Sequence, residues 1–410
     1  MSRNERVVIV GGGLTAARAA EAARGEGFDG KVVVIAEEAR LPYERPPLSK
    51  GYLLGADDAA STIPFDAAWY AEHDVEVRIG TTATAIDTAG HVIALGDDTL
   101  VYDRLLLATG ARPRAFRGPG AGLAGVHTLR SLHDSTVLRT ALAVGSRRVV
   151  VIGSGWIGLE VAAAARSYGN DVTVLGRGSV PLEAAVGPEV GAVFADLHRD
   201  NGVELRMDTG VAGIRGTRHV DGVVLGTGEE VDADLVVVGI GAVPETTLAA
   251  ASGITVDNGI VTDAGLRTSA PDVFAAGDVA NAMHPVLGHH LRIEHWANAR
   301  NQGAAAGRAL AGSAVEYAEI PYFFTDQYDL GMEYSGYGDL AADADVVFRG
   351  DRAGREFIAF WVRDRRVVAG MNVNIWDVNE TVQRFIASRV TVDPVALADT
   401  SVALESLLDA

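Results

Sequence analysis

Two glycine-rich turns carry residue types that suit a dinucleotide. In the first, Gly11, Gly13 and Ala16 form the pattern GxGxxA between an apolar run and a helix-like segment. Gly11 permits a tight turn, Gly13 lets the backbone approach a pyrophosphate, and Ala16 lets the helix lie close to the sheet. Glu37 ends the next apolar run, about 20 residues further on, where a carboxylate binds the ribose 2′-hydroxyl. These residues together predict a dinucleotide site.

The second turn has the same glycines without the acid. Gly153, Gly155 and Gly158 form GxGxxG, but the next apolar run ends in Gly176 followed by Arg177. An acid there would accept the 2′-hydroxyl and repel a 2′-phosphate, whereas an arginine attracts the phosphate. The local pattern therefore favours NADPH, or use of both NADH and NADPH. The alternative is that Arg177 is an ordinary solvated residue.

Two charged residues are unusual for their surroundings: Lys50 is one of only two lysines, and Glu160 is an acid in an apolar segment. The chain has 35 basic residues, and only Lys31 and Lys50 are lysines. A sequence so biased toward arginine should retain lysine mainly where a compact ammonium is wanted. Glu160 lies in the apolar segment GLEVAAAA, where a buried carboxylate needs a partner. A chance surface lysine and a purely structural ion pair are the alternatives.

The segments that position these residues form an internal duplication. Residues 7–20 and 149–163 each read as an apolar strand, a glycine-rich turn and a helix, and each is followed by a second apolar strand, at 31–37 and at 171–177. These are two βαβ units with parallel sheets. The fold class is α/β, with two Rossmann-like domains, the second inserted in the first, plus a C-terminal α+β domain. We expect an FAD-binding domain at 1–113 and 242–319, an NAD(P)H-binding domain at 114–241 and a C-terminal domain at 320–410.

Composition excludes several classes of function. The chain has no cysteine, which excludes a catalytic dithiol and cysteine-ligated iron–sulfur or zinc sites, and we expect no metal. The net charge of −19 argues against a nucleic-acid partner. No apolar run reaches the length of a membrane span, and the N-terminal sequence does not resemble a signal peptide. We therefore expect a cytoplasmic protein with no membrane partner.

Motifs spread over nearly the whole chain carry a family resemblance. The chain resembles the putidaredoxin reductase and rubredoxin reductase group of the pyridine nucleotide-disulfide reductase fold, which is related to apoptosis-inducing factor. The segments that carry this resemblance are ERPPLSKGYL at 44–53, LLLATGARPR at 105–114, GSGWIGLE at 153–160, VFAAGDVA at 273–280, RIEHWANARNQG at 292–303 and PYFFTDQY at 321–328.

The resemblance implies FAD in the first site and NAD(P)H in the second. The residues expected around FAD are Gly11, Gly13, Leu14, Thr15, Ala16, Glu37, Arg45, Lys50, Ala83, Ala108, Thr109, Gly110, Arg130, Gly277, Asp278 and Trp296. Those expected around NAD(P)H are Gly153, Gly155, Trp156, Ile157, Gly158, Glu160, Arg177 and Gly241. The resemblance also implies a catalytic Lys50–Glu160 pair near flavin N5, with Asp278 on a ribityl hydroxyl and Trp296 beside the isoalloxazine.

The implied activity is an FAD-dependent ferredoxin–NAD(P)+ reductase. It would pass single electrons to a [2Fe–2S] ferredoxin that serves a cytochrome P450 or a related oxygenase. Rubredoxin reductase activity and a redox-sensing flavoprotein are the alternatives, and the absence of cysteine rules out disulfide reduction. The family commonly has Trp where this chain has Phe324. For docking of an acidic ferredoxin, the sequence points to the arginine-rich segment 349–366.

Overall fold

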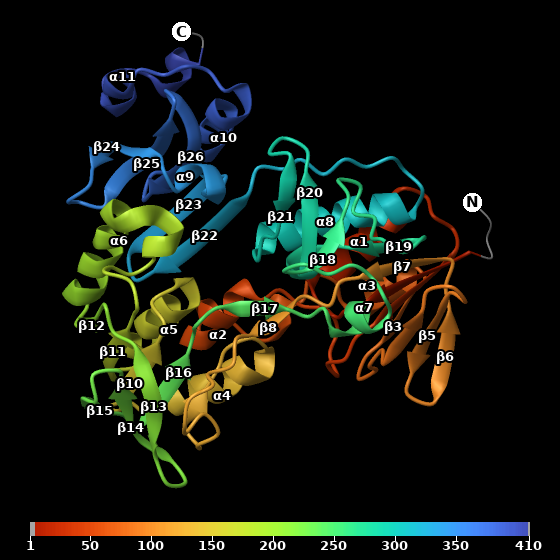
Figure 1. The fold of residues 1–410 in the computed structure, drawn as a ribbon, viewed down its shortest axis with the longest axis horizontal. Coiled ribbons are helices and arrows are strands. Elements are labelled where there is room, and N and C mark those ends of the chain that lie inside the picture. The colour runs from red at the N-terminus through yellow and green to blue at the C-terminus, as the bar shows by residue number, and fades with distance from the viewer. Residues whose placement is uncertain (1–4, 409–410) are drawn as a thin grey trace. The chain divides into compact units, whose positions relative to one another are not determined.

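The computed structural model describes residues 5–408, which form two compact units (Figure 1). The first unit comprises the chain through Pro46 together with Asp58–Arg112 and Ala242–Glu319. The second unit comprises Pro47–Asp57, Pro113–Gly241 and the chain from Ile320 onward. Each unit is therefore assembled from segments that lie far apart in the sequence.

The first unit is built on a five-stranded parallel sheet in the order β19-β7-β1-β2-β3. Its strands are β1 (Arg6–Val10), β2 (Lys31–Ile35), β3 (Val75–Arg78), β7 (Arg104–Leu107) and β19 (Val273–Ala275). The chain leaves this sheet after β7 and returns with β19, which pairs with β7. The central strands are almost entirely apolar and buried, as expected for a parallel sheet covered on both faces.

Two helices of this unit cross at unusually short range. Helix α1 (Leu14–Gly25) follows β1, and α8 (Trp296–Leu310) follows β19 and its neighbouring hairpin. A Cβ atom added at Gly303 would lie 2.6 Å from the Thr15 carbonyl oxygen, and one at Gly307 would lie 2.3 Å from that of Ala19. The two glycines stand four residues apart on one face of α8, so the backbones approach where no side chain intervenes.

The other elements of the first unit are short. They are α3 (Ala67–Glu72), α7 (Thr247–Ala251), a β4–β5–β6 meander (Ala85–Asp87, Val92–Leu95, Asp98–Val101), and a sheet of β18 (Ile260–Thr262), β20 (Ala280–His284) and β21 (His289–Leu291). Strands β8 (Ala111–Pro113) and β17 (Ala242–Pro244) lie where the chain passes between the units.

The second unit repeats the parallel arrangement, in the order β12-β11-β10-β16-β9. Its strands are β9 (Val126–His127), β10 (Arg148–Ile152), β11 (Asp171–Leu175), β12 (Glu204–Arg206) and β16 (Leu235–Val238). The helices are α2 (Gly51–Leu54), α4 (Leu132–Leu142), α5 (Trp156–Ser167) and α6 (Glu183–Asp200). A three-stranded antiparallel sheet of β13 (Val211–Gly216), β14 (Val220–Leu225) and β15 (Glu230–Asp232) is inserted before β16.

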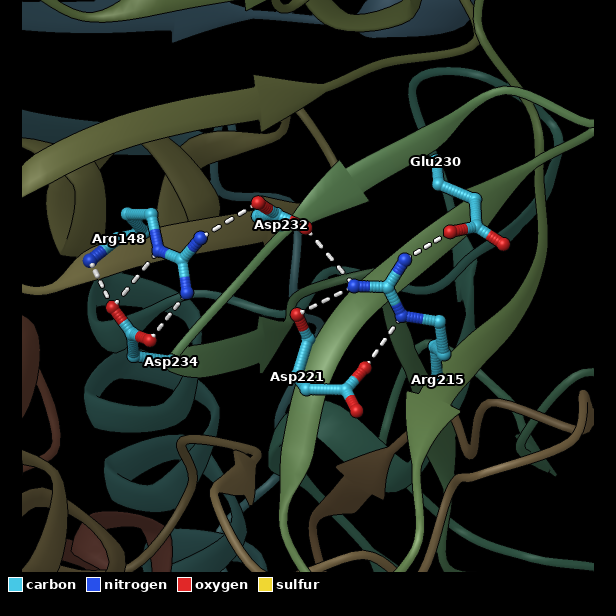
Figure 2. Close-up of polar contacts among 6 residues, drawn as sticks. All are labelled: Arg148, Arg215, Asp221, Glu230, Asp232 and Asp234. Carbon is cyan, nitrogen blue, oxygen red and sulfur yellow. Dashed lines mark hydrogen bonds and ion pairs between the residues drawn. The ribbon is translucent and has the colours of Figure 1, made fainter.

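A surface charge network ties this inserted sheet to the start of β10 (Figure 2). Arg148 donates to Asp232 at 2.8 Å and to Asp234 at 2.7 Å, and Asp232 also accepts from Arg215 at 2.9 Å. Hydrogen bonds from Arg148 hold the pKa of the Asp234 carboxyl below its usual range. The network lies at the amino end of β10, so we assign it to stability and not to the chemistry at the opposite end.

The second unit also contains a C-terminal antiparallel sheet in the order β22-β23-β26-β25-β24. Its elements are β22 (Tyr322–Gln327), β23 (Leu330–Gly336), α9 (Gly338–Ala341), β24 (Asp345–Asp351), β25 (Glu356–Arg363), β26 (Arg366–Val373), α10 (Asn379–Ser388) and α11 (Pro394–Ala398). Met332 and Phe357 from this sheet share one buried apolar cluster with Leu159 of α5 and Phe194 of α6. The sheet is thus packed on the helices of the second parallel domain.

These features confirm the predicted fold class of two Rossmann-like domains and a C-terminal α+β domain. Within residues 5–408, none of the helices combines the length and the apolar character needed to cross a membrane.

Candidate functional site

The first glycine-rich turn leaves its backbone open at the end of β1. Gly11 has a φ of +139°, and a Cβ atom there would lie 2.1 Å from the Ala108 carbonyl oxygen. Gly13 precedes the first turn of α1, and a Cβ atom there would meet nothing within 4 Å. The first glycine is therefore required by the fold, whereas the second leaves space beside the free N–H groups of a helix N-terminus. That space fits a pyrophosphate.

Other predicted residues gather at the same edge of the first sheet. Thr109 and Gly110 follow β7, and the segment Gly277–Asp278 follows β19. The Thr109 hydroxyl donates to the Glu245 carbonyl at 2.7 Å. Because β1, β7 and β19 are parallel neighbours, their carboxyl ends bring these segments together beside the turn at Gly11.

Sequence reasoning missed a buried amide that holds this edge in place. The side-chain oxygen of Gln302, which is 2% exposed, accepts a hydrogen bond from the Gly277 backbone N–H at 2.9 Å. Gly277 has a φ of +81°, and a Cβ atom there would lie 2.3 Å from Thr15 Oγ1. Gln302 therefore fixes the loop that carries Asp278. The available signal was a polar residue among the alanines and glycines of α8.

The remaining first-site predictions are placed less uniformly. Glu37 is exposed just after β2, whereas its neighbour Glu38 accepts hydrogen bonds from Tyr43 and from Arg45. Trp296 begins α8, half-buried, with the Arg300 guanidinium 5.4 Å from its ring centroid. Ala83 is half-buried just before β4, and Leu14 and Ala16 are buried in α1. Lys50 and Arg130, both assigned to FAD from the resemblance, belong to the second unit.

The second glycine-rich turn has the same geometry as the first. Gly153 has a φ of +116°, and a Cβ atom there would lie 2.1 Å from the Gly239 carbonyl oxygen. Gly155 precedes α5, and a Cβ atom there would meet nothing within 4 Å. At Gly158 a Cβ atom would lie 2.1 Å from the Gly153 carbonyl oxygen, so the helix packs against the turn itself. This turn also offers a helix N-terminus with room for a pyrophosphate.

Several predicted nucleotide residues surround this turn. Trp156 and Ile157 form the first turn of α5; Trp156 is half-buried and the Ile157 side chain is 44% exposed. Gly241 follows β16, and its carbonyl accepts a hydrogen bond from the Arg114 N–H at 2.9 Å. Strand β16 pairs with β10, so Gly241 follows the strand that neighbours the one before the glycine-rich turn.

The position after β11 has a packing role as well as a chemical one. Gly176 is buried, and a Cβ atom there would lie 2.5 Å from both Ser154 Oγ and Met207 Cε. Arg177 is exposed beside it. The missing acid at 176 is therefore explained in part by lack of space, which the sequence pattern alone did not reveal.

The Lys50–Glu160 pair exists within the second unit, where four polar groups meet. Glu160, on α5, is 4% exposed. Lys50 Nζ and Thr325 Oγ1 donate to one of its carboxylate oxygens, and Ser49 Oγ donates to the other. The Lys50 ammonium also lies 5.5 Å from the centroid of the Phe324 ring. These contacts satisfy a buried carboxylate with one cation and two hydroxyls. Within residues 5–408, Lys50 Nζ has no hydrogen bond besides the one to Glu160, so it can donate two more.

A chain of hydrogen bonds continues from this cluster to His198 of α6. Gln327 Nε2 donates to Thr325 Oγ1 at 3.3 Å, and Gln327 Oε1 binds His198 Nε2 at 2.8 Å. Burial lowers the pKa of His198 to about 4. Desolvation raises the pKa of Asp326, and the nearby Lys50 ammonium opposes this rise. None of Thr325, Gln327 and His198 was singled out from the sequence.

The arginine-rich segment 349–366 is only partly available to a partner. Arg349 donates to the carbonyls of Leu397 and Val402, and Arg355 pairs with Asp200 of α6. Arg352 donates to the Glu189 carbonyl at 2.6 Å. Arg352 nevertheless remains exposed, as do Arg363, Arg365 and Arg366. The docking hypothesis drawn from the sequence therefore rests on these four exposed arginines and not on all six.

Comparison with known proteins finds relatives along the whole chain. The family model "pyridine nucleotide-disulphide oxidoreductase" matches residues 5–303, and "reductase C-terminal" matches residues 322–408. The chain is 43% identical over 404 residues to the ferredoxin–NAD(+) reductase component of the anthranilate 1,2-dioxygenase system of Burkholderia cepacia, covering 98% of both chains. It is 35% identical to putidaredoxin reductase of Pseudomonas putida, covering 100% of this chain and 98% of the relative.

Solved structures agree with these relatives. The crystal structure of the covalent putidaredoxin reductase–putidaredoxin complex matches with a TM-score of 0.94 and 35% identity, covering 100% of this chain and 99% of the other. The ferredoxin reductase for the CYP199A2 system of Rhodopseudomonas palustris matches with a TM-score of 0.94 and 34% identity, covering 98% and 99%. The chain thus belongs to the pyridine nucleotide-disulphide oxidoreductase family, in the branch that carries the reductase C-terminal domain.

Proposed function

We propose that this chain is an FAD-dependent ferredoxin reductase that oxidises NADH or NADPH. Its electrons would pass one at a time to a [2Fe–2S] ferredoxin, which serves a dioxygenase or a cytochrome P450. The observation that carries the proposal is similarity over both the nucleotide-binding region and the C-terminal domain to relatives named as ferredoxin reductase components. A cytoplasmic location is part of the same proposal.

The first glycine-rich turn is proposed to hold FAD. Its fit is supported by the open space at Gly13 and by the free N–H groups of α1. Thr15, Glu37 and Asp278, at the same edge of the sheet, are proposed to bind the ribose and ribityl hydroxyls. Bound FAD supplies the capacity to accept a hydride and to release single electrons.

The second turn is proposed to hold the nicotinamide nucleotide, with its pyrophosphate at Gly155. Exposed Arg177 would then accommodate either a 2′-hydroxyl or a 2′-phosphate. Lys50 and Glu160 are proposed as the catalytic pair. Glu160 keeps the Lys50 ammonium in one place, and the ammonium offers a fixed positive charge and hydrogen-bond donor.

The test is electron transfer from NADH or NADPH to cytochrome c, with and without an added [2Fe–2S] ferredoxin. The proposal expects multiple turnovers that depend on ferredoxin concentration. Slow reduction of the bound flavin with no ferredoxin dependence would contradict the proposal, and would instead favour a redox-sensing flavoprotein.

A further inference from the structure

The Glu160 carboxylate receives its three hydrogen bonds from two segments of the second unit. Lys50 and Ser49 lie just before α2, and Thr325 lies on β22 of the C-terminal sheet. Thr325 is 1% exposed, so water does not compete for its hydroxyl. The proposed catalytic pair is therefore completed by a residue from a domain that contributes no glycine-rich turn.

The direction of hydrogen bonding along this chain follows from its chemistry. The amide oxygen of Gln327 only accepts, so the neutral His198 ring must donate from Nε2. The amide nitrogen of Gln327 only donates, so Thr325 Oγ1 accepts that hydrogen bond. The single hydroxyl proton of Thr325 is then left for Glu160. Every bond in the chain points toward the carboxylate.

We propose that Thr325 is a positioning residue for the Lys50–Glu160 pair, an inference that rests on the proposed function. Thr325 and Lys50 donate to the same carboxylate oxygen. Because Gln327 donates to the Thr325 hydroxyl oxygen, the hydroxyl proton points at Glu160 Oε1 and occupies one of its lone pairs. The Lys50 ammonium can then approach that oxygen only along the other lone pair. The C-terminal domain thereby sets where the Lys50 charge lies.

Three variants of the holoenzyme separate positioning from packing. Thr325→Val keeps the shape and removes the hydroxyl, and Thr325→Ser restores the hydroxyl in a smaller side chain. Thr381→Val is a matched control, because Thr381 is 8% exposed and its hydroxyl lies 3.2 Å from the Glu405 carboxylate in the same domain. It removes a comparable hydrogen bond without touching Glu160.

The first readout uses the scarcity of lysine. Only Lys31 and Lys50 are present, so protein labelled isotopically at the lysine side-chain nitrogen gives two ammonium signals in NMR spectra. Thr325→Val should move the Lys50 signal and speed its proton exchange, and Thr325→Ser should largely restore it. The signal of exposed Lys31 should stay in place in every variant. An unmoved Lys50 signal in Thr325→Val would overturn the proposal.

The second readout is the rate of flavin reduction at saturating nucleotide. We expect Thr325→Val to slow it by about tenfold, the effect of losing one hydrogen bond to a charged group. Thr325→Ser should recover most of the rate, and Thr381→Val should match the wild type. An unchanged rate in Thr325→Val, or equal slowing in Thr325→Ser, refutes positioning. If the wild type itself is not reduced by either nucleotide, the proposed function fails, while the NMR signals still decide whether Thr325 positions Lys50.

Discussion

Replacing Lys50 with methionine should destabilise the protein as well as slow flavin reduction. The structure shows the Lys50 ammonium as the only cation that contacts Glu160 within residues 5–408. The side chains are 16% and 4% exposed. Removing one partner of a fully buried pair costs about 3–5 kcal/mol. Because Ser49 and Thr325 still donate to the carboxylate, we expect a loss of about 2–3 kcal/mol.

A second variant separates two effects of removing Lys50: the loss of its hydrogen bond to Glu160, and the burial of a Glu160 charge that no longer has a cation beside it. In Lys50→Met/Glu160→Gln the buried group is neutral, and its amide oxygen still accepts from a hydroxyl. We expect the double variant to regain at least half of the lost free energy of unfolding. Urea unfolding followed by circular dichroism measures the free energy of unfolding of each variant. The measurements are made at low and high salt, and the loss should be similar in both because salt screens a buried pair little. Lys31→Met is the matched control, since Lys31 is exposed.

Two results would refute this reasoning. If Lys50→Met unfolds at the same urea concentration as Lys31→Met, Glu160 does not depend on the ammonium. If the double variant is less stable than Lys50→Met, the stranded charge is not the source of the loss. Flavin reduction should be slow in both Lys50 variants, so recovery of stability without recovery of rate would identify the chemical role of the ammonium.

Four further outcomes are expected. Gly13→Ala should weaken FAD binding at least about tenfold without lowering apoprotein stability, because its Cβ meets only open space; equal FAD retention in wild type and variant would contradict this. Arg177→Glu should raise the KM for NADPH far more than that for NADH; rejection of NADPH by the wild type would show that Arg177 is only a surface residue. His198→Gln should remove a pH dependence of stability, because the buried ring stays neutral while the unfolded chain binds a proton. Between about pH 6.5 and pH 4 the free energy of unfolding of the wild type should fall by about 3 kcal/mol relative to the variant. Equal falls in the two proteins would contradict this role of His198. Asp232→Asn should cause a smaller, salt-sensitive loss of stability than Lys50→Met, with an unchanged KM for the nucleotide (Figure 2); a changed KM would mean that the network reaches the site.

The two dinucleotide turns were predictable because their physical requirements are local. A strand, a backbone without Cβ atoms and a helix N-terminus lie within about ten residues of one another in a Rossmann turn, so the pattern GxGxxG reports the geometry directly. The short distances at Gly11 and Gly153 show why only glycine fits there. The fold class followed from seeing this pattern twice, each time with a second apolar strand behind it.

What the sequence did not reveal depends on contacts between distant segments. Thr325 meets Glu160 across 165 positions, and nothing in PYFFTDQY shows which of its polar side chains points toward α5. Gly176 resembled a lost acid until Ser154 and Met207 were placed beside it. Arg349 and Arg355 were counted toward a docking surface, but the structure pairs Arg349 with the carbonyls of Leu397 and Val402 and Arg355 with Asp200 of α6. In each case the sequence shows the type of residue, but only the structure shows which distant residue it contacts.

Helix α5 carries the turn proposed to bind the nucleotide and the carboxylate that holds the Lys50 ammonium, and it contacts strand β22 of the C-terminal sheet. Its N-terminus at Gly155 faces the space for a pyrophosphate, and Trp156 packs against Phe323 of β22 at 4.9 Å between ring centroids. One turn further, Glu160 binds Thr325 of the same strand. A helix is stiff over so short a distance, so we expect a shift at its first turn to be passed on to the Glu160 carboxylate and to the β22 residues that contact the helix. The turn proposed to bind the nucleotide and the carboxylate that holds the Lys50 ammonium are therefore carried by the same helix, which also contacts β22.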